Sequence, residues 1–292
     1  MILIGENIHI ISKVVSEAVR NRDAAAIQAL ATAQAQAGAD YLDLNLGPAR
    51  RDPEEVGSWL VNTVQEVTDL PISLDTMNPA AMEAGLALCK TRPILNSASG
   101  KAESKELMMP LAVKYNTQVI ISVITDLGCP PDVDARVESI RETVAYANGL
   151  VISNEDIFVD PIILPVSADQ KQVREALEFI RILPDLLPDV RSVVGLSNVS
   201  NGTPAHLRGI LNRTYLVMLE KCGLYSAIAD VLDPELVGLN RGGIKDIREL
   251  IHGVMEGEQV ETSGLPEKAR DYVKTARVLM GDALYSHAWL ES

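Results

Sequence analysis

The chain has 292 residues, of which 47% are hydrophobic and only 4% aromatic, so the core of a single large domain would be aliphatic. Its 40 acidic and 26 basic residues give a net charge of −14, which argues against nucleic acid or an anionic membrane as partner, because no global positive field attracts them. The three cysteines lie far apart without metal-binding spacing, so we expect a reducing cytoplasm and no bound metal.

Eight short apolar runs follow one another along the chain, and each is typical of a parallel strand that is buried on both faces. They lie near residues 2–5, 41–46, 72–75, 93–96, 118–124, 156–160, 192–197 and 225–230. The first run opens the stretch MILIGENIHII, which lacks the basic region of a signal peptide and indicates a first strand. No apolar run approaches the roughly 20 residues of a membrane span.

Helical patterns fill the intervals between these runs. Residues 23–37 are rich in alanine, residues 207–222 are apolar at helical spacing, and a glycine follows each segment. The stretches 129–131 and 183–188 are rich in proline and are predicted to be loops. Helix start signals stand at Asp52-Pro53, Asn78-Pro79, Asp132 and Asp233-Pro234.

About eight strand–helix units in alternation predict an α/β fold of the (β/α)8 TIM-barrel type. A doubly wound sheet also alternates, but its glycine-rich fingerprint is absent after the first strand, where the chain reads GENIHI. We expect residues 1–260 to form the barrel and residues 261–292 a C-terminal helical extension of the same domain.

The extension carries one long helical pattern, predicted over residues 267–289. Its apolar stripe consists of Ala269, Tyr272, Val273, Ala276, Leu279, Met280, Ala283 and Leu284. This stripe would pack against the barrel or a sister subunit; a dedicated element for docking a partner is the alternative. With an aliphatic core and such a stripe, we expect a homodimer.

Four polar residues stand at the C-terminal ends of apolar runs: Asp75, Asn96, Asp160 and Asn198. In a barrel these ends meet at one mouth, where the active site lies. Two carboxylates and two amides suit a neutral ligand that is rich in N–H donors and ring nitrogens. Each residue alone could instead order its own loop, and Asp160 precedes a proline, as turn-starting aspartates do.

Further polar side chains stand near the first two strands, namely Glu6, Asn7, His9, Asp43 and Asn45. Asp43 and Asn45 share one side of their strand because they are two residues apart. They could line the mouth or be structural hydrogen-bonding groups inside the barrel.

Several chemistries lack their residues. The four histidines are isolated from one another, which gives a zinc site little support. No predicted strand ends in the lysine that a Schiff-base aldolase needs. No nucleophile elbow or P-loop motif occurs.

Several motifs in one order resemble the pterin-binding methyltransferases over roughly residues 1–240. They are Leu3-Ile4-Gly5-Glu6, Tyr41-Leu42-Asp43-Leu44-Asn45, Leu74-Asp75-Thr76, Leu95-Asn96-Ser97, Asp160-Pro161 and Gly195-Leu196-Ser197-Asn198-Val199-Ser200, followed by Leu211-Asn212-Arg213-Thr214-Tyr215-Leu216. The chain looks most like the methyltetrahydrofolate:corrinoid protein methyltransferases, including those that serve the corrinoid iron–sulfur protein. The folate domain of methionine synthase and dihydropteroate synthase are similar at a greater distance.

The resemblance implies a homodimeric barrel that holds methyltetrahydrofolate as substrate and receives a corrinoid on a partner protein. It implies that Asp75, Asn96 and Asp160 bind the pterin ring and that Asn198 is the catalytic residue beside N5. Gly195 and Ser197 belong to the same pterin-binding motif as Asn198. Further candidates for the site are Glu6, Asp43, Asn45 and Arg208.

The chain departs from that family at three places: Asn7 and His9 stand where members often have Arg and Asn, the loop 201–208 is altered, and the tail beyond residue 260 is long. Three functions stay open. The first is methyl transfer between N5 and a corrinoid cobalt, in either direction. The second is pterin condensation, as in dihydropteroate synthase, which needs a basic site for pyrophosphate. The third is a catalytically silent binding subunit.

Overall fold

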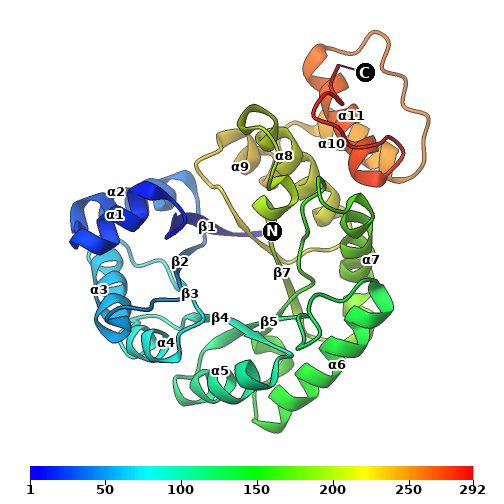
Figure 1. The fold of residues 1–292 in the computed structure, drawn as a ribbon. Helices are drawn as coiled ribbons and strands as arrows, with labels where there is room; N and C mark the ends of the chain where they lie inside the picture. Colours follow the sequence, from blue (N-terminus) through cyan, green and yellow to red (C-terminus); the bar gives the residue numbers. More distant parts are fainter. Residues whose placement is uncertain (292) are drawn as a thin grey trace.

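The computed structural model describes residues 1–291, in which eight parallel strands form a closed barrel in sequence order, with β8 pairing back onto β1 (Figure 1). The strands are β1 (Ile2–His9), β2 (Tyr41–Gly47), β3 (Ile72–Thr76), β4 (Ile94–Ser99), β5 (Gln118–Ser122), β6 (Ile157–Asp160), β7 (Arg191–Gly195) and β8 (Ser226–Ala229). The predicted TIM barrel is therefore confirmed, and every predicted apolar run overlaps a strand.

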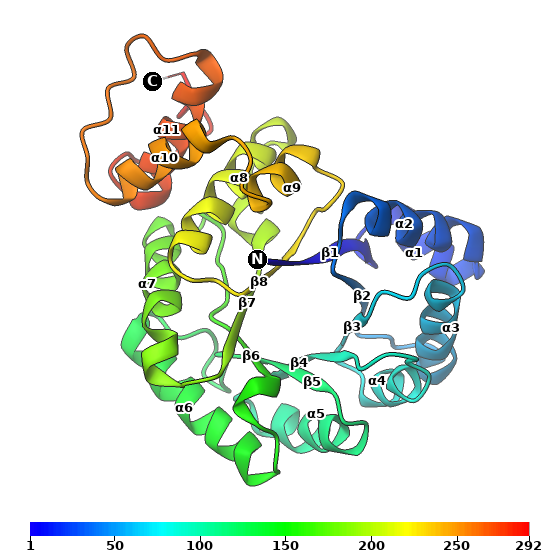
Figure 2. The ribbon, with the colours of Figure 1, turned by 180° about the vertical axis from the view of Figure 1, so that it is seen from behind.

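A ring of helices surrounds the barrel, as Figure 2 also shows from behind. The helices are α1 (Lys13–Asn21), α2 (Ala24–Ala37), α3 (Pro53–Gln65), α4 (Pro79–Leu86), α5 (Ala102–Lys114), α6 (Val133–Gly149), α7 (Gln170–Leu186), α8 (Ala205–Lys221) and α9 (Pro234–Asn240). Two more, α10 (Lys245–Met255) and α11 (Glu267–Met280), lie outside the ring beside α7 and α8. None of these helices is long and apolar enough to cross a membrane, as far as residues 1–291 show.

A helix begins at all four predicted start signals, and at three of them the predicted side chain makes a capping hydrogen bond. The side chain of Asn78 accepts hydrogen bonds from the N–H groups of Ala80 and Ala81, and Asp132 and Asp233 cap their helices in the same way. Asp52 precedes α3 as predicted but makes no capping bond. Its φ of 44° is left-handed, whereas a capping side chain reaches back from an extended backbone.

Two predicted boundaries are wrong. Helix α7 continues through Pro184 to Leu186, although residues 183–188 were predicted to be a loop. Ile180 and Leu183 are buried on its inner face, so packing holds the last turn despite the proline. In the tail, α11 ends at Gly281 (φ 81°), so the predicted helix to residue 289 is too long.

The apolar stripe of the tail is confirmed in its first part. Tyr272, Val273, Ala276 and Leu279 are buried, and α11 packs on α7 and α8. Leu284 lies beyond the helix and is 88% exposed, so the stripe ends with the helix.

The barrel interior is divided into a floor and a mouth. The floor is an apolar layer made of Ile4, Ile94, Ile120, Phe158 and Val193. These side chains come from the first halves or middles of their strands. The strand ends beyond them carry the polar residues and form the mouth, where a cavity opens.

Strand β1 contains a bulge. Gly5 stands opposite Leu42 and Ile8 opposite Leu44, so three steps along β1 match two along β2. The side chain of Gln34 in α2 fills the space where Gly5 lacks a Cβ, and its Oε1 accepts the N–H of Asn7 at 3.0 Å. The bulge therefore rests on a glycine and on a buried amide behind the strand.

Candidate active site at the mouth of the barrel

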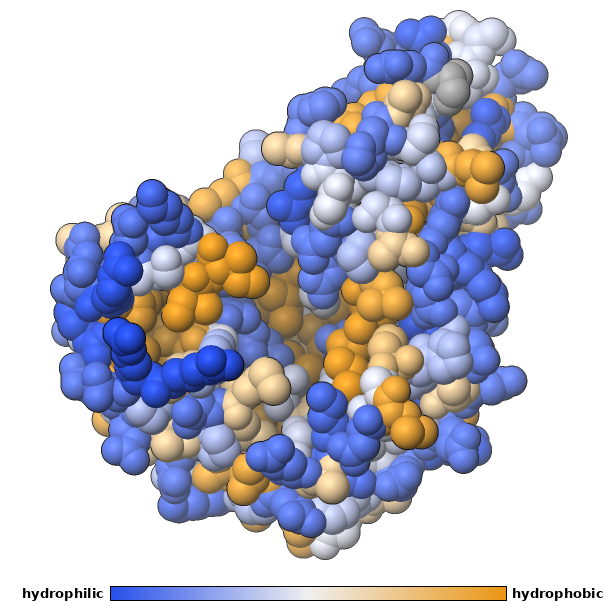
Figure 3. All heavy atoms as spheres, viewed as in Figure 1, coloured by the Kyte–Doolittle hydropathy of each residue, from blue (hydrophilic) through white to orange (hydrophobic). Residues whose placement is uncertain are grey.

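A cavity of about 730 Å³ opens at the carboxyl ends of the strands. All ten residues predicted for the site line it: Glu6, Asp43, Asn45, Asp75, Asn96, Asp160, Gly195, Ser197, Asn198 and Arg208. Figure 3 shows a hollow within the ring of helices, with hydrophobic residues gathered beside it. The structure thus brings the predicted residues together, while the role of each stays a prediction.

The deepest polar group of the cavity is Asp43 on β2, which is 4% exposed. Its Oδ1 accepts hydrogen bonds from Ser73 Oγ at 2.7 Å and from Asn96 Nδ2 at 3.0 Å. The amide of Asn96 is therefore oriented from below, with its carbonyl oxygen left for a ligand. Both earlier interpretations of Asp43 hold, because it is a buried hydrogen-bonding group that also borders the cavity.

Asp75 and Asp160 form the two carboxylate walls of the cavity. Asn45 donates from its Nδ2 to Asp75, and its own Oδ1 accepts the N–H of Gly47 at 3.0 Å. Asp160 accepts the N–H of Ile162 at 2.8 Å. The turn interpretation of Asp160 is thus correct, and the same carboxylate also faces the cavity.

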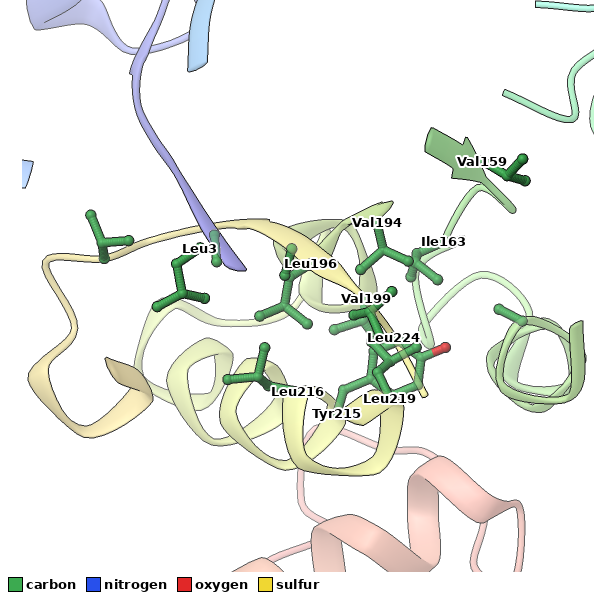
Figure 4. Close-up of a cluster of buried hydrophobic side chains, with 14 of the residues drawn as sticks. Leu3, Val159, Ile163, Val194, Leu196, Val199, Tyr215, Leu216, Leu219 and Leu224 are labelled. Carbon is green, nitrogen blue, oxygen red and sulfur yellow. The ribbon is translucent and has the colours of Figure 1, made fainter. Parts of the chain in front are cut away.

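Asn198 lies on a short 3-10 turn, η2 (Leu196–Ser200), directly after β7. Leu196 and Val199 on either side of it are fully buried and point toward α8, as Figure 4 shows. Gly195 leaves room for the amide, because a Cβ there would lie 3.0 Å from Asn198 Nδ2. Asn198 Oδ1 accepts a hydrogen bond from Asn201 Nδ2 at 3.2 Å, so both sides of the turn fix the amide.

The bulge of β1 delivers two consecutive polar side chains, Glu6 and Asn7, to the same cavity. Glu6 Oε1 accepts the hydroxyl of Ser197 at 2.5 Å, and Asn7 Nδ2 donates to Asp230 at 2.9 Å. Arg208 donates to the hydroxyl of Ser200 at 3.1 Å. These contacts join β1, the turn after β7 and α8 into one wall.

Burial raises the pKa of four carboxyl groups that line the cavity. The pKa of Glu6 rises to about 7 and those of Asp43 and Asp160 to about 6. The pKa of Asp75 lies well above its usual range, through burial first and then through the nearby Asp43 carboxylate. The cavity can therefore hold protons near neutral pH and give them up to a ligand.

Some residues of the cavity were missed in the sequence: Asn201, Ala205, Gly209, Asn212, Asp230 and Asp233. Asp230 follows the eighth strand directly, so the strand-end rule that found Asp75 could have found it. Arg208 and Asn212 are four apart on α8, and this helical spacing marks the face turned to the cavity. The amide oxygens of Asn7 and Asn212 are buried without a partner, as expected of groups that await water or ligand.

No group of three or more histidine, cysteine, aspartate or glutamate side chains is placed to hold a metal ion anywhere in residues 1–291. The cavity presents hydrogen-bonding groups to a ligand. They comprise carboxylates and amides at the strand ends, and one arginine on α8.

The family model for pterin binding enzymes matches residues 12–228. The chain belongs to the pterin-binding enzyme family. The match spans the strands from β2 to β8 and therefore nearly the whole mouth of the barrel. The resemblance inferred from the strand-end motifs is thus confirmed at the level of the family.

Two relatives of this pterin-binding enzyme carry established names. The chain is 29% identical over 240 residues to the methylcorrinoid:tetrahydrofolate methyltransferase of Eubacterium limosum, which covers 82% of this chain and 88% of that protein. It is 28% identical over 209 residues to the methionine synthase of Mycobacterium tuberculosis, which covers 68% of this chain and 18% of the synthase. The pterin-binding enzyme thus matches less than a fifth of the synthase.

Solved structures of dihydropteroate synthases share the fold. The Yersinia pestis enzyme superposes with a TM-score of 0.59 at 17% identity, over 83% of this chain and 92% of that one. The Xanthomonas albilineans enzyme in complex with 7,8-dihydropteroate gives a TM-score of 0.58 at 16% identity, over 82% and 92%. These likenesses support the barrel of the pterin-binding enzyme.

Proposed function

We propose that this pterin-binding enzyme transfers a methyl group between N5 of tetrahydrofolate and the cobalt of a corrinoid that a partner protein carries. The observation that carries the proposal is that Asn198 and the carboxylates of Asp75 and Asp160 line one cavity. The relative named methylcorrinoid:tetrahydrofolate methyltransferase, alike over most of both chains, supports the same reaction.

The carboxylates and the deep amide fit the edge of a pterin. An aminopyrimidinone ring presents adjacent N–H donors, which a carboxylate such as Asp75 or Asp160 accepts, and a carbonyl or ring nitrogen for an amide. Asn96 supplies that amide, and Asp43 orients it at 3.0 Å. Because burial raises the pKa of Asp75 and Asp160, it disfavours their charged forms, and N–H donors of a bound ring would stabilise the two carboxylates.

Asn198 would act at N5. An amide oxygen stabilises positive character on a nitrogen without titrating, so it favours both departure of a methyl group and its arrival. In the direction of methylation, N5 attacks the methyl carbon, the carbon–cobalt bond breaks, its electron pair stays on cobalt as Co(I), and N5 loses its proton. The reverse reaction begins with protonated methyl-N5, which is the better leaving group.

The rim of the mouth suits a protein partner. Ile11, Met77 and Leu127 lie in the loops after β1, β3 and β5 and are 87%, 79% and 99% exposed. Apolar groups at the edge of an open cavity are typical of an interaction surface. We include in the proposal that the corrinoid protein docks there, that the catalyst is a cytoplasmic homodimer, and that residues 261–292 extend the same domain.

Pterin condensation fits the cavity less well. A pterin pyrophosphate would need several cations, but the described lining holds six carboxylates and one arginine, Arg208. That arginine reaches the cavity from α8. Its guanidinium already contacts Ser200, the carbonyl of Ser197 and Asn201.

The direct test mixes the purified protein with tetrahydrofolate and free methylcobalamin, and follows the cobalt spectrum. We expect conversion to Co(I) with formation of methyltetrahydrofolate, and a rate that falls as the pH drops, because protonated N5 cannot attack. From methyltetrahydrofolate and Co(I), the rate should rise as the pH drops. Absence of transfer in both directions, with the partner corrinoid protein also supplied, would refute the proposal.

The matching variant is Asn198→Ala. If the amide acts in the transition state, kcat/KM falls roughly tenfold to a thousandfold, while pterin affinity falls less. The control is Asn62→Ala, the same exchange at an exposed position of α3, which leaves both unchanged. Unchanged turnover of Asn198→Ala would reduce this residue to an amide that orders its own turn.

A further inference from the structure

The C-terminal segment after α11 reaches the turn that carries Asn198. The hydroxyl of Tyr285 lies 2.7 Å from Thr203 Oγ1, in the loop between η2 and α8. Thr203 is 8% exposed, and its side chain is not spent on capping, because α8 begins after Pro204 without a side-chain cap. The two hydroxyls therefore form a contact between segments 82 residues apart.

Tyr285 is held firmly enough to act as an anchor. The amide of Gln170, at the start of α7, donates to the carbonyls of Val278 and Ala283, both at 2.6 Å. Its Oε1 accepts the N–H of Tyr285 at 3.2 Å. The ring of Tyr285 also packs against Trp289, with centroids 5.6 Å apart, and Trp289 is 2% exposed. One glutamine thus ties the end of α11 and the tail to the barrel.

A short path leads from Thr203 to the catalytic amide. The N–H of Thr203 donates to the carbonyl of Ser200 at 3.1 Å, and the N–H of Asn201 donates to that of Asn198 at 3.1 Å. Asn201 Nδ2 then donates to Asn198 Oδ1 at 3.2 Å. A shift of Thr203 is therefore passed to the side chain of Asn198 through backbone and side-chain bonds of one loop.

The loop has a second anchor on its other side. Val166 donates its N–H to the carbonyl of Val199 at 2.9 Å, and Ser167 Oγ donates to that of Asn201 at 2.9 Å. The turn is thus held between the loop after β6 and the C-terminal segment. Loss of one anchor should loosen the loop without unfolding it.

We propose that Tyr285 is a positioning residue for methyl transfer: through the Thr203 hydroxyl, the C-terminal segment fixes the loop 196–204 and with it the amide of Asn198. The inference rests on the proposed function for its kinetic consequence only. The segment lies outside residues 12–228, which the family model matches, so the tether is not part of the matched framework.

The test compares Tyr285→Phe, which removes the hydroxyl and keeps the ring, with the native protein. We expect kcat for methyl transfer to fall about threefold to tenfold, the scale of one neutral hydrogen bond. The dissociation constant for tetrahydrofolate should change less than twofold, because Asp75, Asn96 and Asp160 stand on other strands. Unchanged kcat, or a loss of affinity as large as the loss of kcat, would overturn the proposal.

Partner variants separate positioning from general destabilisation. Thr203→Val should match Tyr285→Phe, and the double variant should be no worse than either single one, as for two partners of one bond. Thr203→Ser keeps the hydroxyl and should restore kcat. Additive losses in the double variant would contradict the tether.

The matched control is Lys274→Met, which removes another bond to the tail, from Lys274 Nζ to the carbonyl of Leu290 at 2.7 Å. It should leave kcat unchanged. Amide hydrogen exchange supplies a readout without catalysis: exchange of residues 196–204 should accelerate about threefold to tenfold in Tyr285→Phe and not in Lys274→Met. Faster exchange in a protein that transfers no methyl group would preserve the tether and refute the proposed function; unchanged exchange would refute the tether.

Discussion

The floor and the mouth of this barrel are built from the same strands but differ in chemistry: the floor is apolar, and the mouth presents polar groups. At the floor, Ile4, Ile94, Ile120, Phe158 and Val193 exclude water from a dry layer. A few residues further along these strands or their neighbours, burial raises the pKa of carboxyl groups that line the mouth. The comparison teaches that the floor raises the stability of the fold, whereas the buried carboxyl groups of the mouth lower it and form a site for a ligand.

The largest expected effect would break the floor. Phe158 is 1% exposed, and its ring meets Tyr225 edge to face at a centroid distance of 5.8 Å. Phe158→Ala should lower the free energy of unfolding by about 3–5 kcal/mol, through lost burial and the cavity it leaves. Urea denaturation measures this. Leu127→Ala at the rim, 99% exposed, is the control and should change stability little; equal losses would abolish the contrast.

The next prediction sharpens the contrast at the mouth through pH. Burial raises the pKa of Glu6 from 4.5 to about 7, so the native state binds a proton that the unfolded chain releases in that range. Stability should therefore fall as the pH rises from about 4.5 to 7. Glu6→Gln keeps an oxygen that accepts from Ser197 but has no titrating group. The free energy of unfolding of this variant should therefore equal that of the native protein at pH 4 and exceed it by about 3 kcal/mol at pH 8.

Denaturation of both proteins at the two pH values decides this. Glu106→Gln, the same exchange on the exposed surface of α5, is the control. A Glu6→Gln advantage that stays constant across the range would show that this carboxyl is not strained by burial.

A third prediction concerns the affinity of the mouth for tetrahydrofolate. Asp75→Ala should weaken tetrahydrofolate binding by about 1.5–3 kcal/mol, the scale of a charge-assisted hydrogen bond. The unliganded variant should be no less stable than the native protein, because the carboxyl it loses is disfavoured by burial. Calorimetry and denaturation measure the two quantities. Asp185→Ala on the exposed face of α7 is the control; unchanged affinity of Asp75→Ala would remove Asp75 from the pterin site.

The smallest effect tests whether every polar residue near the mouth serves the ligand. Asn78 caps α4 through bonds of 3.0 and 3.3 Å to the N–H groups of Ala80 and Ala81. Asn78→Ala should cost about 1 kcal/mol of stability and leave pterin affinity unchanged. Asp52→Ala is the control, because Asp52 precedes α3 without a capping bond. A loss of affinity in Asn78→Ala would extend the functional mouth to the helix caps.

The sequence predicted the barrel because its signal is local and repeated: each strand is an apolar run, and each run ends near a polar residue. Asp75, Asn96, Asp160 and Asn198 were named by the same rule, and all four line the cavity. The ends of α7 and α11 were not predicted correctly. Tertiary packing extends α7 past Pro184, and Gly281 ends α11 before residue 289. Asp52 shows the same limit, since its sequence context is that of a cap and its backbone angle is not.

The contacts that join distant segments could not be predicted from any short stretch. The bond from Asn7 to Asp230 spans 223 positions, and that from Tyr285 to Thr203 spans 82. The four residues in these two contacts are of ordinary types for their elements. The composition and periodicity of the sequence therefore do not reveal either contact. Closure of the barrel brings the first pair together, and the path of the tail brings the second.

The bulge in β1 determines how many of its polar side chains face the cavity. Three residues there span the distance of two on β2, and this is why Glu6 and Asn7 can both face the cavity. Deleting Glu6 or Asn7, the two residues between Gly5 and Ile8, would straighten β1, keep its later pairing in register, and leave one polar group there in place of two. A lineage of this fold can therefore add or remove a ligand-facing group by an insertion or deletion of one codon, with every neighbouring core residue unchanged.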